Sequence, residues 1–271
     1  PIDTTTVAKT RKLLLEEFTG HLCVNCPKGA LAIRSLHTDF PEKIISVAYH
    51  ASTTWAKPEA SPSIYRQDFR TPMGEAFVTT FNIQAFPSAM INRLNFLNNK
   101  HRLTNADVWR DTFAVHKDRA PDAFLTINNS YASGSSALTT TVTCEFLNLM
   151  TGSYNLVVFL TEDSIVAPQK NGSASAPEDP AYAHPHAANY VHMHMVRACI
   201  SDGTGTGVQI VSGSAAAGDT VVKTFNYTLP ATFNGAAPTG TSPVAKNCNV
   251  VAFIYNTATQ EVIQAEEKKI Q

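Results

Sequence analysis

The sequence has no excess of charge of either sign and no long hydrophobic run. Its formal net charge is −1 over 271 residues, with 21 Lys and Arg against 22 Asp and Glu. Because no basic face accumulates, nothing in the composition favours a nucleic-acid partner or an anionic membrane surface. No apolar run approaches the roughly 20 residues that a membrane-spanning helix needs. These absences exclude partners that are selected by bulk charge.

A signal peptide is also missing, and Pro1 is not a natural start, so we expect a mature form from which any export signal has been removed. Hydrophobic residues make up 44% of the chain and charged residues 16%, which indicates a folded protein. The length suggests one large domain or two ordinary ones. The composition leans toward Ser, Thr, Asn and Ala, which suits an exported protein.

The first part of the chain, residues 9–119, alternates strand and helix patterns. A short continuous apolar run such as Lys43–Tyr49 is typical of a strand buried on both faces of a parallel sheet. The stripe of apolar residues in Lys28–Asp39 predicts a helix that ends before Pro41. Strands are also predicted at Lys12–Phe18 and Ser88–Ile91. This order predicts an α/β domain.

From Pro121 onward the apolar period changes to two. Leu138–Phe146 alternates apolar and polar side chains, as a strand with one buried face does. Links rich in Gly, Pro, Ser and Asn separate several such runs, so residues 121–271 are predicted to form an all-β, immunoglobulin-like sandwich. Further strands are predicted at Tyr154–Thr161, Tyr190–Ile200, Thr220–Tyr227, Asn247–Tyr255 and Glu261–Ala265, and Pro168–Asn189 is predicted to be a long loop.

One local pattern carries redox chemistry. Cys23 and Cys26 are separated by two residues and lie where a predicted strand passes into a helix. Two such cysteines form or break a disulfide with little backbone movement, and a helix N-terminus stabilises a thiolate. The pattern indicates thiol–disulfide exchange. Two alternatives stay open: a disulfide that only staples a turn, and a zinc site, although no second Cys-x-x-Cys pair is present.

Residues 9–119 resemble the thioredoxin fold in three features. The Cys23–Cys26 motif follows a strand, the acidic Glu17 stands six positions before Cys23, and Pro87 directly precedes a strand. The resemblance implies that Cys23 is the exposed nucleophile and Cys26 the resolving thiol. It also implies that Glu17 relays protons to Cys26 and that a cis Pro87 lies beside the cysteines. No cofactor is implied.

The chain departs from the thioredoxin pattern around the cysteines. Pro27 follows Cys26 directly, and proline favours the first turn of a helix. A helix that starts with Cys26 as its N-cap would leave Cys23 outside the helix dipole, so its thiolate would be less favoured. His21 is then a candidate cation near Cys23, although only when it is protonated.

Other histidines and cysteines offer weaker signals. If Tyr190–Ile200 is one strand, His192 and His194 share a face, with methionines opposite. With His184 or His186 they are a candidate metal site, but no recognisable ligand set is complete and a polar sandwich surface is the simpler interpretation. Cys144 is predicted to be a buried free thiol, and Cys199 and Cys248 are either bridged or free.

Several segments together resemble the twenty-eight-kilodalton outer-membrane protein family of gut and oral anaerobes. They are Leu15–His21 with the Cys-x-x-Cys-Pro-x-Gly motif, Tyr190–Arg197, Val250–Tyr255 and Glu261–Ala265. The resemblance implies a lipoprotein of the cell envelope, associated with the outer membrane and anchored by a lipid on a cysteine upstream of Pro1. The expected partners are protein thiols or disulfides, with exchange through Cys23 and Cys26.

The main alternative is a non-catalytic surface or periplasmic interaction protein, in which the thioredoxin-like fold is a scaffold. A metal-dependent hydrolase is a third.

Overall fold

The computed structural model describes residues 8–172 and 186–271. The first half of the chain contributes three strands and three helices. They are β1 (Leu13–Thr19), α1 (Cys26–Asp39), β2 (Ile44–His50), α2 (Pro72–Thr80), β3 (Ser88–Ile91) and α3 (Trp109–His116), with short 3₁₀ turns at Phe96–Asn98 and Ala106–Val108. No helix among these described residues is long and apolar enough to cross a membrane.

In residues 121–172 and 186–271, the second half consists of strands and one 3₁₀ turn. The strands are β4 (Ala123–Ala132), β5 (Ala137–Phe146), β6 (Met150–Glu162), β7 (Ile165–Lys170), β8 (His186–His192), β9 (Met195–Cys199), β10 (Val208–Ala215), β11 (Thr220–Thr228), β12 (Cys248–Asn256) and β13 (Val262–Lys269), and the turn is Ala245–Asn247.

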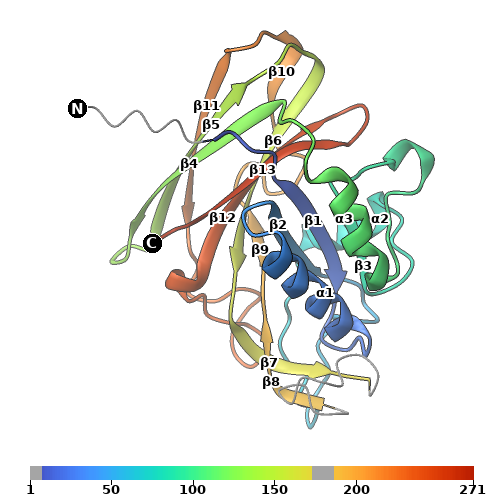
Figure 1. The fold of residues 1–271 in the computed structure, drawn as a ribbon. Coiled ribbons are helices and arrows are strands. Elements are labelled where there is room, and N and C mark those ends of the chain that lie inside the picture. The colour runs from blue at the N-terminus through green and yellow to red at the C-terminus, as the bar shows by residue number, and fades with distance from the viewer. Residues whose placement is uncertain (1–7, 173–185) are drawn as a thin grey trace.

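A single large sheet passes through both halves. Its order is β13-β12-β6-β9-β2-β1-β3, with β10 paired to β6. Strands β1 and β2 are parallel, as the continuous apolar runs predicted, and β2 meets β9 through the pair Ala48 and Met195. The connection between α3 and β4 coincides with the predicted boundary, but the sheet is continuous across it (Figure 1).

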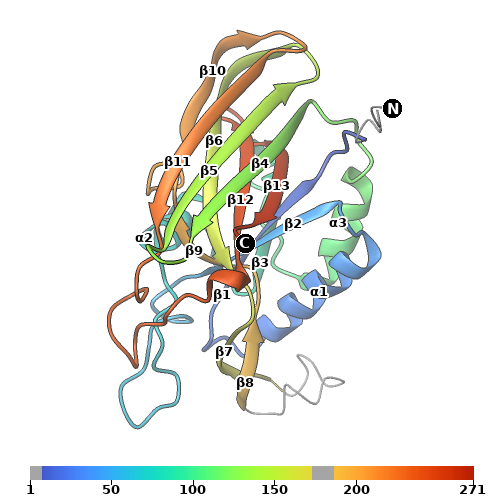
Figure 2. The same ribbon diagram turned by 90° about the vertical axis from the view of Figure 1, so that its left-hand side faces the viewer.

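A three-stranded sheet, β11-β5-β4, lies across one face of the β6 and β12 region (Figure 2). Its inward side chains alternate along β5, where Leu138, Val142 and Cys144 are fully buried. They pack against β6 and β12 in one apolar core. A second core joins residues from both halves of the chain, among them Phe18, Tyr49, Phe159 and Phe253.

The long segment predicted as one strand, Tyr190–Ile200, is two strands. Strand β8 ends at His192 and β9 begins at Met195, because His194 takes a left-handed conformation with φ of 56°. Strands β7 and β8 form a separate antiparallel pair at one end of the molecule, beneath α1 (Figure 1). The loop predicted from Pro168 to Asn189 is therefore shorter, since β7 continues to Lys170.

Candidate functional site

The cysteine pair lies in the turn between β1 and α1. Cys23 and Cys26 are joined by a disulfide, with their Cα atoms 5.4 Å apart. Helix α1 starts at Cys26, with Asn25 as its N-cap and Pro27 in its first turn. Cys23 therefore lies before the helix, in a turn closed by a hydrogen bond from its own N–H to the Gly20 carbonyl oxygen. The predicted disulfide contact is confirmed.

The disulfide is buried, which contradicts the exposed position expected for Cys23. Cys23 and Cys26 each expose only 2% of their surface, whereas Val24 between them exposes 43%. Disulfide exchange requires that a thiolate approach one of the two sulfur atoms along the S–S axis. In this closed arrangement neither sulfur atom is presented to a large partner.

The end of β7 covers the cysteine turn. The main-chain N–H of Lys170 donates to the carbonyl oxygen of His21 over 2.8 Å, and that of Gly172 donates to the Val24 carbonyl oxygen over 2.8 Å. We call residues 169–172 the cover. The sequence predicted a loop for this segment. Cys23 is buried rather than exposed because the cover, about 146 residues further along the chain, packs on the turn.

Gln169 attaches the cover from the inside. Its side-chain Nε2 donates to the carbonyl oxygens of Gly20 (3.2 Å) and Cys23 (2.9 Å), and to that of its neighbour Lys170 (2.9 Å). The residue is 2% exposed. The inward positions of β7 are Ala167 and Gln169, so the strand period places this amide against the turn.

On its outer side the cover meets the loop that follows β2. The Nζ atom of Lys170 lies 3.1 Å from Oε1 of Glu59 and 5.2 Å from the ring centre of Tyr65. Hydrogen bonds from Ser63 and then from Lys170 lower the pKa of Glu59, so this carboxylate is charged wherever the ion pair forms. The contact is partly exposed, and exposed ion pairs contribute little to stability.

Three buried histidines gather around Phe69 next to the turn. The ring centres of His21, His50 and His192 lie 5.9, 5.4 and 5.5 Å from that of Phe69. Burial lowers the pKa of His21 to about 4 and of His192 to about 3, and places that of His50 well below its usual value. His21 is thus neutral near pH 7, and its predicted role as a cation beside Cys23 is wrong.

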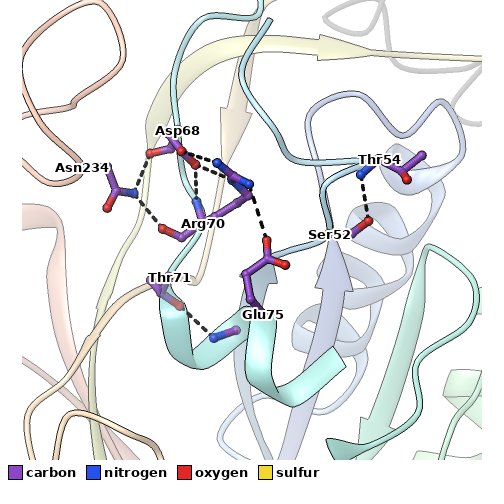
Figure 3. A network of polar contacts seen from close by, with 8 residues as sticks. Ser52, Thr54, Asp68, Arg70, Thr71, Glu75 and Asn234 are labelled. Carbon is purple, nitrogen blue, oxygen red and sulfur yellow. Dashed lines mark hydrogen bonds and ion pairs between the residues drawn. The ribbon is translucent and has the colours of Figure 1, made fainter. Parts of the chain in front are cut away.

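Polar contacts hold the loop that carries Phe69. The guanidinium of Arg70 binds both carboxylate oxygens of Asp68 and lies 3.9 Å from Glu75, and Thr71 caps helix α2 (Figure 3). Figure 3 also shows the side chain of Asn234 reaching this loop, where it donates to the carbonyl oxygens of Asp68 and Arg70. The second half of the chain therefore anchors the loop against which the turn packs.

In the first turn of α1, Glu17 and Pro87 meet at Gly29. A Cβ atom on Gly29 would lie 2.5 Å from Oε1 of Glu17 and 3.0 Å from both Cβ of Pro87 and the ring of Trp109. The bond between Phe86 and Pro87 is cis, as predicted. Glycine in the Cys-Pro-x-Gly motif is thus required by a close approach of these side chains.

Glu17 has an unusual environment for a carboxyl group. It is 3% exposed, its Oε1 atom has no hydrogen-bond partner, and burial raises its pKa to about 8. It also lines a cavity of about 380 Å³ between α1 and the β8–β9 turn, together with Ile33, His37, Tyr190, Met193 and His194. Glu17 is protonated at pH 7 and able to exchange a proton near neutrality.

The remaining histidines do not form the predicted pattern. His192 points toward His50, with ring centres 5.1 Å apart, whereas His194 stacks on His37 at 4.9 Å. They do not share a strand face, because the chain turns between them. His184 lies outside the described residues, and the side chain of His186 is not described. Within the described ranges no group of three or more His, Cys, Asp or Glu is arranged to hold a metal ion.

The other three cysteines are buried free thiols. Cys144 is fully buried in the sandwich core, which confirms that prediction. Cys199 and Cys248 do not bridge each other. The site residues that sequence reasoning missed are Gln169, Lys170 and His50. A polar residue at an inward strand position was the available signal for Gln169, and it was hidden within the segment taken for a loop.

Comparisons with known proteins identify one family and several solved structures of similar fold. A family model described as "Outer membrane protein Omp28" matches residues 74–271. Among solved structures, HBP35 of Porphyromonas gingivalis is similar over 98% of this chain and 77% of its own, with a TM-score of 0.64 and 16% identity. An Agrobacterium tumefaciens protein is similar over 98% of this chain and 97% of its own, with a TM-score of 0.51 and 12% identity.

A domain of the outer membrane lipoprotein Omp28 from Porphyromonas gingivalis is also found, with a TM-score of 0.35 and 17% identity over 56% of this chain and 89% of its own. A search of curated proteins finds no match. At their identities, HBP35 and the Agrobacterium tumefaciens protein support the fold alone.

Proposed function

Because this chain belongs to the Omp28 outer membrane protein family, we propose that it is a non-catalytic interaction protein of the cell envelope. Its family places it in the envelope, associated with the outer membrane. In this proposal, residues 9–119 are a thioredoxin-like scaffold and residues 121–271 an immunoglobulin-like sandwich that carries partner binding.

The closed disulfide carries this proposal. Cys23 and Cys26 are each 2% exposed, and the cover is attached by two main-chain hydrogen bonds and by the amide of Gln169. A catalyst of thiol–disulfide exchange must present a sulfur atom to its substrate. A disulfide enclosed in this way instead stabilises the turn between β1 and α1.

The thioredoxin-like assignment is supported by the arrangement of the first half. Strand β1 leads into the cysteine turn, α1 follows, and β2 returns parallel to β1. Glu17 and Pro87 both lie against Gly29, one turn into α1. Fold alone does not confer activity, so the assignment is compatible with a scaffold.

The test is turnover of a model protein disulfide in the presence of a dithiol reductant. We expect wild type and Cys23→Ser to give the same background rate. In parallel, partners captured from envelope extracts by wild type should also be captured by the Cys23→Ser/Cys26→Ser double variant. Turnover that is well above background and is lost in Cys23→Ser would contradict the scaffold function.

A second candidate function, thiol–disulfide exchange, is favoured by one observation. Glu17 is a buried acid whose Oε1 atom has no hydrogen-bond partner and whose pKa is about 8, near the value that suits proton transfer at neutral pH. In this candidate, the Cys23 thiolate attacks a substrate disulfide and expels one substrate thiolate. The ionised form of Glu17, which is the minor form at pH 7, accepts the Cys26 proton, and the Cys26 thiolate attacks the Cys23 sulfur. The bond between Cys23 and the substrate breaks, the second substrate thiolate leaves and takes up the proton from Glu17, and the protein is left with its Cys23–Cys26 disulfide.

Trapping tests this second candidate. A Cys26→Ser variant keeps the attacking thiol and loses the resolving one, so it should accumulate a mixed disulfide with a substrate protein. A Glu17→Gln variant should slow resolution more than the first attack. If Cys26→Ser traps no species and Glu17→Gln shows unchanged kinetics, thiol–disulfide exchange is rejected and the scaffold function remains.

A further inference from the structure

We propose that residues 169–172 are an autoinhibitory cover that must leave the cysteine turn before the Cys23–Cys26 disulfide reacts, and that Gln169 is the residue that keeps it closed. This goes beyond the scaffold function, because it makes the disulfide latent rather than permanently inert. The effect of the cover on protein substrates rests on the second candidate function. Its effect on reduction of the Cys23–Cys26 disulfide is measurable without any protein substrate.

The cover occupies the main-chain hydrogen-bonding groups beside the cysteines. The carbonyl oxygens of His21 and Val24, on either side of Cys23, both accept from the cover. An extended chain that approached Cys23 along this edge would need the same two acceptors. The cover and an incoming chain therefore exclude each other.

Gln169 contributes contacts that a plain strand end would not. Its amide donates to the carbonyl oxygens of Gly20 and Cys23, which also accept the main-chain N–H groups of Cys23 and Cys26, and the residue is 2% exposed. Breaking buried hydrogen bonds without replacing them is costly. Opening the cover breaks these bonds together, so the closed state is the resting state.

The outer contact of the cover is weaker and is suited to adjustment. Lys170 and Glu59 form an ion pair in which the side chains are 30% and 38% exposed. Salt screens such pairs, whereas the enclosed amide bonds of Gln169 are little affected by it. We therefore infer that Gln169 sets the closed state, and that Lys170 only adds to it.

Reduction by dithiothreitol measures opening directly. One dithiothreitol thiolate attacks a protein sulfur, the S–S bond breaks, and its electron pair goes to the other cysteine sulfur, which is protonated. The second dithiothreitol thiol then displaces the first cysteine, so the reagent leaves as its cyclic disulfide and Cys23 and Cys26 are both reduced. If opening must come first, the observed rate constant reaches a plateau as the reagent concentration rises.

The decisive comparison uses two glutamine variants. Gln169→Ala should raise the rate of reduction at low dithiothreitol by about tenfold or more, since it removes at least two buried hydrogen bonds. Gln264→Ala is the matched control. Gln264 is 1% exposed and donates to the Thr10 carbonyl oxygen over 2.9 Å, but it lies at the opposite end of β1. Its loss should leave the rate within about twofold of wild type.

Three results would overturn the cover. One is a wild-type rate that stays linear in reagent and matches a short unstructured Cys-x-x-Cys peptide. Another is a Gln169→Ala rate equal to that of Gln264→Ala. The third comes from hydrogen exchange of the Lys170 and Gly172 amides in the wild-type protein, which keeps the test valid if Gln169→Ala fails to fold. At a pH high enough for cover opening to limit exchange, those amides should exchange at the plateau rate of reduction. Slower exchange under that condition would mean that reduction proceeds under a closed cover.

The outcomes also separate the cover from the proposed functions. A plateau with acceleration in Gln169→Ala, but no turnover of protein disulfides by either protein, supports the cover and rejects exchange. Turnover by wild type with ungated reduction rejects the cover and supports exchange.

Discussion

The side chain of Glu17 lies so close to Gly29 that a Cβ atom there would be 2.5 Å from its Oε1 atom. The same Cβ would lie 3.0 Å from Pro87 and from Trp109, so three elements meet at one glycine. This contact fixes the first turn of α1 against β1 and the start of β3. It makes the position of the helix, and with it the position of Cys26, sensitive to a single methyl group.

We expect Gly29→Ala to destabilise the protein by about 1–3 kcal/mol, the usual cost of overpacking. Urea unfolding followed by circular dichroism measures the effect. Gly134→Ala is the matched control, because nothing lies within 4 Å of a Cβ at that position. It should be neutral or slightly stabilising. Equal stability of the two variants would show that α1 shifts freely away from Glu17.

The raised pKa of Glu17 predicts a pH dependence of stability. The folded-state pKa is about 8 and the ordinary value is 4.5, so the folded protein holds a proton that the unfolded chain releases. The contribution is fully present below pH 4.5 and is lost as the pH rises through about 8. In the wild type, the free energy of unfolding should fall by up to about 1.4 kcal/mol per pH unit between pH 5 and 8, and Glu17→Gln should remove this fall. Unfolding curves of both proteins at three pH values check it, and parallel pH profiles would contradict it.

The histidine cluster predicts the opposite trend in acid. His21, His50 and His192 have lowered pKa values in the folded protein, because burial disfavours the imidazolium. Their contribution is present above about pH 6.5, the unfolded value, and is lost as the pH falls toward 4. His50→Leu should flatten the acid limb by up to about 1.4 kcal/mol per pH unit. Unfolding between pH 7.5 and 4.5 measures it, and an unchanged slope would mean that His50 is solvated.

A buried ion pair ties β1 to the residues after β3. Arg93 binds both carboxylate oxygens of Glu16 at 2.8 Å, and both side chains are at most 2% exposed. Arg93→Met should cost about 3–5 kcal/mol, because it leaves Glu16 charged and buried. Adding Glu16→Gln to it should recover part of the loss. Lys28→Met, which breaks an exposed pair with Asp107, should cost less than about 1 kcal/mol.

Local patterns predicted much of the first half, because its elements are determined by nearby residues. The apolar run at residues 43–49 and the stripe at 28–39 correspond to β2 and α1 to within two residues. The alternation in β5 likewise gave the burial of Cys144. That Glu17 and Pro87 belong to one region could be inferred only through the resemblance to thioredoxins, and the two side chains meet at Gly29 of α1.

What could not be predicted depends on contacts between distant segments. Nothing near Gln169 indicates that it meets the Cys23 carbonyl, and nothing near His50 indicates that it packs on Phe69 and His192. The predicted strand Tyr190–Ile200 is divided into β8 and β9 by the left-handed His194. Tertiary packing decided that break. The burial of the disulfide also depends on a distant segment, residues 169–172, so local patterns could not predict it.

The cover should protect a single thiol as well as the disulfide. In Cys26→Ser, Cys23 keeps its place in the turn, and its carbonyl oxygen still accepts from Gln169. Its thiol should therefore react slowly with a small aromatic disulfide such as Ellman's reagent, and adding Gln169→Ala should speed the reaction by about tenfold, as two lost hydrogen bonds imply. The buried thiols Cys144, Cys199 and Cys248 serve as internal controls, because neither substitution touches them. Mass spectrometry of the labelled peptides assigns each rate. If Cys23 reacts at the rate of a free cysteine in the single variant, the turn opens once the disulfide is gone, and the bond rather than Gln169 holds the cover.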